Sequence, residues 1–167
     1  MAPLTDSVNP LINKHIVYEF EGLEGSDTPA RYEAWCQSEE TIVYKMHGGP
    51  YKGRSAYQRA FYQKLSDADE IYMISWIEEV GTTVSLVVNL KEKTINGFLA
   101  FAPGHFRERE IFRADKRNPE TLDQWRQLAY VDNKPIHRVP YQVFARIIEV
   151  SEGAGDLQPR TEADPYF

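Results

Sequence analysis

The residue of this sequence with the clearest chemical potential is Glu78. It ends the apolar segment that starts at Ile71, and by the two-residue period of a β-strand it shares a face with Tyr72, Ile74 and Trp76. If that face lines an interior, the carboxyl group enters an aromatic environment, where loss of hydration raises its pKa and makes it a proton donor near neutral pH. If the other face is inward, Glu78 is an ordinary surface acid, and the pattern does not choose between the two.

Two further segments could contribute to such a site. Tyr18 and Phe20 lie on one face of the first predicted strand, and Arg54 follows a glycine-rich turn. A buried arginine needs an anion, so an inward Arg54 would suit an acidic ligand or a pairing with Glu78. From the residues alone, a rim position with a surface ion pair is the simpler interpretation of Arg54.

Other catalytic patterns are absent from the sequence. It contains no glycine-rich phosphate loop, no Gly-x-Ser-x-Gly elbow and no His-Glu-x-x-His pair. Its single cysteine, Cys36, excludes an intramolecular disulfide and a cysteine-based metal cluster, and its four histidines lack paired ligand spacing. We therefore expect no metal site, and we interpret the alternating charges between His105 and Arg117 as a solvated edge or loop.

The composition is that of one domain with a substantial core. The chain has 167 residues, of which 42 % are apolar, and its net charge of −6, without a long run of lysine or arginine, argues against a nucleic-acid partner. Ten tyrosines suit a pocket for a planar ligand, although aromatic residues are also simply favoured on strands. Because no segment resembles a signal peptide or a membrane span, we expect a cytoplasmic protein without a membrane partner.

The elements that would position these residues are mainly β-strands. Strand-forming segments cover residues 15–21, 31–37, 41–47, 71–78, 82–91, 94–102 and 141–150, and residues 53–65 are a strand or, less readily, a helix. One helix is predicted over Pro119–Leu128, with Asn118 as its cap. The brief turns favour an antiparallel barrel or sandwich over residues 15–150, preceded by an N-terminal arm (1–14) and followed by a flexible C-terminal tail (151–167).

Three segments, in this order, resemble the phenolic acid decarboxylase family: His15–Glu21, Tyr44–Arg54 and, most specifically, Ser75–Leu86. The resemblance extends from about His15 to Pro103 and continues more weakly through the last strand. It implies a mainly β fold, a lipocalin-like antiparallel β-barrel with one short helix in the C-terminal half of the chain. It also implies a homodimer that converts hydroxycinnamic acids to vinylphenols without a cofactor.

Carried over residue by residue, the resemblance implies that Glu78, Arg54 and Tyr18 are catalytic. It implies a substrate site lined by Phe20, Trp76, Tyr44 and His47.

This sequence departs from the family pattern at three places. Phe20 replaces a second family tyrosine, Ser55 replaces an aromatic residue, and residues 107–110 stand where a His-Pro-Glu segment is usual. The departures imply a reshaped pocket, whose substrate need not be a simple coumarate or ferulate. We expect a small aromatic or unsaturated carboxylic acid.

Two other functions fit the same residues. A cofactor-free isomerase, cyclase or dehydratase could use Glu78 and Arg54 on a larger substrate and would need no second tyrosine. A lipocalin-like binding protein would need no chemistry, and fold similarity by itself does not exclude it.

Overall fold

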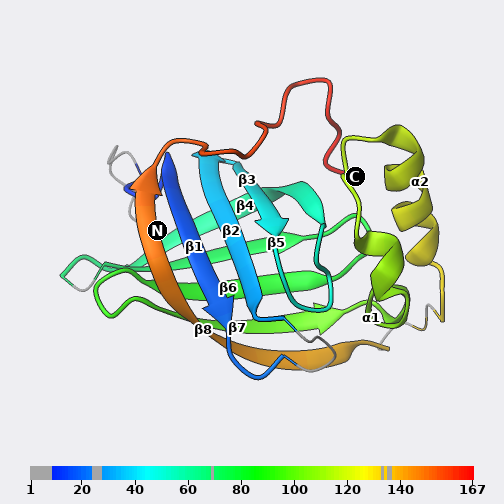
Figure 1. Ribbon diagram of the computed structural model, residues 1–167, viewed down its shortest axis with the longest axis horizontal. Coiled ribbons are helices and arrows are strands. Elements are labelled where there is room, and N and C mark those ends of the chain that lie inside the picture. The colour runs from blue at the N-terminus through cyan, green and yellow to red at the C-terminus, as the bar shows by residue number, and fades with distance from the viewer. Residues whose placement is uncertain (1–8, 24–27, 69, 133, 135–136) are drawn as a thin grey trace, which may run out of the picture.

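The chain folds into a closed antiparallel barrel in which β1 to β8 follow one another in sequence order (Figure 1). The computed structural model describes residues 9–23, 28–68, 70–132, 134 and 137–167. Each predicted strand is present, and residues 53–65, left open between strand and helix, contribute to β4. The strands are β1 (Lys14–Phe20), β2 (Ala30–Ser38), β3 (Thr41–Met46), β4 (Ser55–Ser66), β5 (Ile71–Ile77), β6 (Thr83–Asn89), β7 (Thr94–Phe101) and β8 (Val139–Glu152).

Strand β8 closes the barrel because it is long enough to pair with both neighbours. Residues 139–146 pair with β7, and residues 145–152 pair with β1. This double pairing removes the open edges that a sandwich would keep.

The barrel interior is filled by the alternate residues of each strand. On β5 the inward residues are Tyr72, Ile74 and Trp76, which are all buried. Burying each large apolar side chain contributes on the order of 1.5–3 kcal/mol, so this alternation decides which strand faces point inward.

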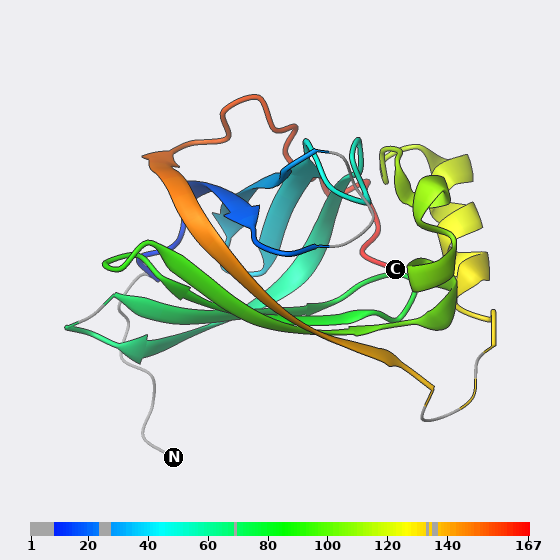
Figure 2. The same ribbon diagram turned by 60° about the horizontal axis from the view of Figure 1, so that its bottom comes forward.

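Two helices and a 3-10 turn cover one end of the barrel (Figures 1 and 2). They are α1 (Pro103–Arg107), η1 (Arg109–Phe112) and α2 (Pro119–Leu128). As predicted, α2 is capped by Asn118, whose side-chain oxygen accepts a hydrogen bond from the Glu120 backbone N–H at 2.9 Å. None of the helices in the described part of the chain is long and apolar enough to cross a bilayer.

The charged strip from His105 to Arg117 differs from its interpretation as a solvated edge or loop. Arg107 and Glu108 are exposed, but His105 and Lys116 are buried. Phe112 packs fully buried against the barrel end, and the turns around it carry these two polar side chains inward.

The segment after β8 runs over the barrel toward α2 (Figure 1). Its composition predicts a flexible tail, yet Leu157 is buried beside Val43 and Tyr57, and Tyr166 Oη lies 2.6 Å from Thr41 Oγ1. Most of the predicted N-terminal arm lies outside the described residues.

Candidate active site

A tight turn places Glu78 inside the barrel. The Gly81 N–H donates to the Glu78 carbonyl, and the Glu78 N–H donates to the Thr82 carbonyl, each at 2.8 Å. Gly81 has a φ of +85°, a conformation that glycine adopts without the strain of a side chain. Glu78 therefore continues the inward face of β5, and of the two arrangements open from the sequence, the structure has the buried one.

The Glu78 carboxyl group is held by several polar side chains. Tyr44 Oη donates to Oε1 at 2.8 Å and Arg54 Nη2 donates to Oε2 at 3.1 Å. Trp76 Nε1 lies 3.4 Å from Oε1, and His105 Nδ1 lies 3.3 Å from Oε2. The fold thus gathers Arg54, Tyr44 and Trp76 around the Glu78 carboxyl group. Tyr44 and Trp76, which the resemblance assigned to the substrate site, are not among the residues that line the pocket inside the barrel.

Arg54 is fully buried rather than placed at the rim. Its Nη2 also donates to Glu79 Oε1 at 2.9 Å, and its guanidinium carbon lies 4.2 Å from the centre of the Trp125 ring and 5.0 Å from that of Phe112. This stacking holds the flat guanidinium between aromatic rings and two carboxyl groups. Arg54 is therefore placed to orient carboxyl groups of the protein. It does not line the pocket that the barrel encloses beside Glu78.

Glu79 and Lys116 complete a buried ionic network that the sequence did not reveal. By strand period Glu79 should face away from Glu78, but the turn brings both inward. Glu79 Oε2 accepts from Gln58 Nε2 at 3.0 Å and from Lys116 Nζ at 3.0 Å. Lys116 stands between Asp115 and Arg117 in a loop, where no periodic signal distinguishes it from a solvated lysine.

The environments of Glu78 and Glu79 push their pKa values apart. Burial raises the pKa of Glu78, against the opposing effect of Arg54, and the negative charge of Glu79 raises it further. Burial also disfavours the charged form of Glu79, but Arg54 and Lys116 together outweigh it and hold the pKa of Glu79 below its usual value. Opposite shifts of two neighbouring carboxyl groups are the pattern by which active sites separate an acid from a base.

His105 joins this network from α1. Its Nδ1 lies 2.8 Å from Thr82 Oγ1. Burial and then the positive charge of Arg54 lower the pKa of His105 well below its usual value, so the imidazole is neutral at neutral pH. Like Lys116, it lies in the strip whose charges suggested a solvated loop.

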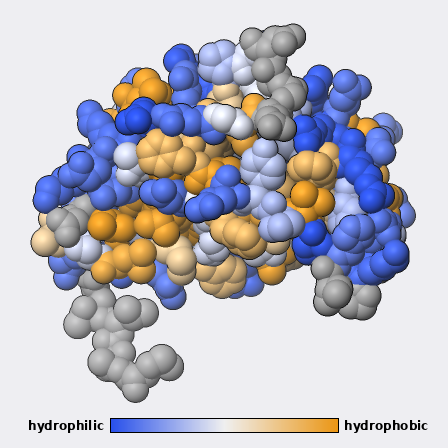
Figure 3. All heavy atoms as spheres, turned by 90° about the horizontal axis from the view of Figure 1, so that it is seen from below, coloured by the Kyte–Doolittle hydropathy of each residue, from blue (hydrophilic) through white to orange (hydrophobic). Residues whose placement is uncertain are grey.

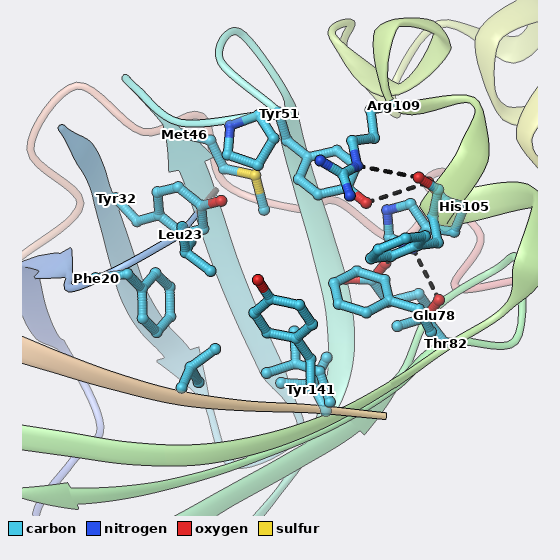
Figure 4. Close-up of a pocket in the computed structure, with 16 residues that line it drawn as sticks. Phe20, Leu23, Tyr32, Met46, Tyr51, Glu78, Thr82, His105, Arg109 and Tyr141 are labelled. Carbon is cyan, nitrogen blue, oxygen red and sulfur yellow. Dashed lines mark hydrogen bonds and ion pairs between the residues drawn. The ribbon is translucent and has the colours of Figure 1, made fainter. Parts of the chain in front are cut away.

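A pocket inside the barrel opens beside Glu78 (Figure 4). Phe20 and Tyr32 lie on one side of it, and Glu78 and His105 lie on the other. Such a pocket suits a flat aromatic ligand with a polar group near Glu78. The lining is mainly aromatic and apolar and includes Phe20, Leu23, Tyr32, Met46, Phe101 and Tyr141.

The two aromatic residues on the inward face of β1 differ in their relation to this pocket. Phe20 lines it, whereas Tyr18 is buried but is not among the lining residues. The Tyr18 ring packs against Phe20 and Tyr32, with ring centres 5.3 and 5.9 Å apart. Burial raises the pKa of Tyr18, so its hydroxyl keeps its proton.

The structure does not bring His47 to the pocket. His47 is exposed, and its Nε2 lies 2.7 Å from Glu33 Oε1. It stands three positions after the inward Tyr44, and an odd step along an extended chain leads to the opposite face.

Known proteins share both the sequence features and the fold. A family model described as phenolic acid decarboxylase matches residues 8–158. The chain is 28 % identical over 96 residues to a probable phenolic acid decarboxylase of Vibrio cholerae, and 34 % identical over 92 residues to phenolic acid decarboxylase PadC of Bacillus subtilis. These alignments cover 58 % and 54 % of this chain, and 51 % and 52 % of the relatives. The chain thus spans about half the length of the curated relatives it matches.

A solved structure titled a putative beta-lactamase from Burkholderia vietnamiensis is similar with a TM-score of 0.53. The likeness covers 85 % of this chain and 99 % of that one, at 14 % identity. It shows the fold alone.

Proposed function

The chain belongs to the phenolic acid decarboxylase family, and we propose that it decarboxylates a hydroxycinnamic-type or related unsaturated acid with its own side chains, using Glu78 as the proton donor. The observation that carries the proposal is the position of Glu78. It is buried at the wall of an aromatic pocket, its pKa is raised, and Arg54 holds it beside the ionised Glu79.

The proposed reaction begins with a proton transfer. A vinylic carboxylate does not readily lose CO₂, because the electron pair left behind has nowhere to go. Glu78 gives its proton to the alkene carbon that bears the carboxylate, the phenolic hydroxyl gives up its own proton, and the ring becomes a quinone methide. The bond to the carboxylate then breaks, its electron pair forms the vinyl double bond, and the ring regains aromaticity as CO₂ leaves. The phenol releases its proton to water, and one proton from water returns Glu78 to its acid form. The vinylphenolate takes a second proton from water as it leaves, so the overall reaction takes up one proton.

The other residues of the site have supporting roles in this proposal. Arg54 and Tyr44 hold Glu78 in place, and the phenolic end of the substrate faces Phe20 and Tyr32, with Tyr18 packed against both. A positioned acid contributes about 10²–10⁴ in rate, and electrostatic stabilisation must supply the rest.

The test is Glu78→Gln, with Glu152→Gln at an exposed ion pair as its matched control. Glutamine has nearly the shape of glutamate but no acidic proton, so we expect turnover to be abolished while the circular dichroism spectrum is unchanged. Incubation with p-coumarate and ferulate, followed by loss of the conjugated-acid absorbance and release of CO₂, measures the reaction. Activity within a few-fold of wild type would remove Glu78 from the mechanism.

The same incubation separates the rival functions. An altered substrate that keeps its carboxyl group selects an isomerase, cyclase or dehydratase. A ligand that binds tightly and is recovered unchanged selects a binding protein.

We also propose a homodimer, and the outer face of β5, β6 and β7 supports it. The outward residues of these strands carry no charge, and Ile77 and Phe98 are half exposed on this face. Figure 3 shows apolar side chains gathered on the molecule seen from below. When identical patches meet across a two-fold axis, like charges would be brought together, and an uncharged face avoids that repulsion. A solution mass near twice the 19.3 kDa of one chain supports this proposal, and the mass of one chain contradicts it.

A further inference from the structure

Arg109 is a cation on the wall of the pocket. It starts η1, and its Nε donates to the Phe106 carbonyl at 3.0 Å while its guanidinium carbon lies 4.4 Å from the centre of the Phe106 ring. These contacts hold the side chain in place without neutralising it, because no carboxylate among the described residues pairs with it. Arg107, two residues earlier, is instead paired with Asp132 at 3.0 Å and is half exposed.

Two fully buried cations, Arg54 and Lys116, are already committed to carboxyl groups of the protein. Arg54 is shared between two carboxyl groups, and Lys116 Nζ lies 3.0 Å from Glu79 Oε2. Neither lines the pocket, and the lining residue His105 is neutral. Of the sixteen described residues that line the pocket, Arg109 is thus the one that offers a positive charge to a ligand.

Arg109 lies on the same side of the pocket as Glu78 (Figure 4). Two further lining residues, Tyr51 and His105, contact each other near Glu78: Tyr51 Oη donates to the His105 carbonyl at 3.1 Å, the two rings are 4.9 Å apart, and His105 Nδ1 is 3.3 Å from Glu78 Oε2. On the opposite side lie Phe20, Leu23 and Tyr32, of which Tyr32 alone has a polar side-chain group, its hydroxyl. A carboxylate on the carbon that Glu78 protonates must lie at the Glu78 end, and this is the end where Arg109 stands.

We propose that Arg109 binds the carboxylate of the substrate and so makes the pocket selective for acids, an inference that rests on the proposed function. With the carboxylate held at this end, the aromatic ring lies toward Phe20 and Tyr32, and the alkene carbon faces Glu78. The carboxylate loses its charge as CO₂ forms, so Arg109 binds the ground state at least as well as the transition state. Its removal therefore raises KM and leaves kcat nearly unchanged.

The experiment compares Arg109→Gln with the matched control Arg107→Gln. A hydrogen bond to a charged group is strong enough that we expect KM for p-coumarate to rise about 10- to 100-fold in Arg109→Gln, with kcat within about threefold of wild type. Arg107→Gln should leave both unchanged, and Arg109→Lys should restore part of the affinity.

Two unreactive ligands give a readout that does not depend on turnover. The saturated analogue of p-coumarate keeps the carboxylate but has no alkene to protonate, and p-vinylphenol has the ring without the carboxylate. Calorimetric titration should show that Arg109→Gln loses affinity for the saturated acid and keeps its affinity for p-vinylphenol.

The outcomes separate this inference from the proposed function. If the wild type decarboxylates p-coumarate and Arg109→Gln keeps the same KM, the inference is overturned and the function stands. Equal losses for both unreactive ligands, or no binding of the saturated acid to the wild type, also overturn it. If no hydroxycinnamate is turned over but the saturated acid binds in an Arg109-dependent manner, the proposed function fails and carboxylate binding by Arg109 is supported.

Discussion

Replacing Lys116 by methionine should destabilise the protein strongly, because Lys116 is a fully buried cation that joins three distant segments. Its Nζ lies 2.9 Å from the Tyr57 carbonyl, 3.0 Å from Gln58 Oε1, 2.8 Å from the Tyr166 carbonyl and 3.0 Å from Glu79 Oε2. Methionine also has an unbranched side chain, but it has no charge and no hydrogen-bond donor. The substitution therefore leaves four oxygens without this donor, and it leaves Glu79 without one of its two cations.

The expected loss of folding stability follows from the burial of the Lys116–Glu79 ion pair. Removing one partner of a buried ion pair costs about 3–5 kcal/mol, against a total stability of about 5–15 kcal/mol for a typical domain. For a chain of this length each kcal/mol lowers the melting temperature by about 2–4 °C, so the midpoint should fall by roughly 6–20 °C. The matched control is Lys14→Met, because Lys14 also pairs with a glutamate, Glu152, at 2.8 Å but at the surface, where little change is expected.

Urea unfolding followed by tryptophan fluorescence, with a thermal melt in parallel, measures the loss. The double variant Lys116→Met, Glu79→Gln should be more stable than the sum of the single effects predicts, because it removes both charges rather than leaving one unpaired. A loss for Lys116→Met as small as that for Lys14→Met would refute the reasoning, and so would strict additivity in the double variant.

Two further predictions concern the pocket and its proton donor. The negative charge of Glu79 helps to raise the pKa of Glu78, so Glu79→Gln should lower the pKa of Glu78. Because Glu78 donates only when it is protonated, the decline of kcat with rising pH should then move to lower pH. A pH profile of kcat equal to that of the wild type would contradict this. Phe20→Tyr returns a hydroxyl to the ring end of the pocket and should raise kcat/KM for simple hydroxycinnamates. A neutral hydrogen bond of about 0.5–1.5 kcal/mol corresponds to roughly two- to tenfold. Reduced activity on these acids, beside good wild-type activity on another compound, would show that Phe20 adapts the pocket to a more apolar substrate.

Most of the strands, helix α2 and one face of the site follow from local patterns in the sequence. Alternation of apolar residues is a local property of an extended chain, so Tyr72, Ile74, Trp76 and Glu78 could be placed on a common face before the fold was known. The cap at Asn118 is equally local, because its partners lie within three residues. The choice of barrel over sandwich came from the resemblance, and the double pairing of β8 shows how the barrel closes.

Which charged residues are buried depends on the three-dimensional fold. Glu79 lies inside because a turn at Gly81 interrupts the strand period, and His47 lies outside because its step from Tyr44 is odd. His105 and Lys116 come from a strip that has the composition of a solvated loop. A charged side chain can be buried only where partners compensate its lost hydration, and the partners of Lys116 come from residues 57, 58, 79 and 166. The closure of the barrel brings these partners together, and no local pattern in the sequence predicts such long-range contacts.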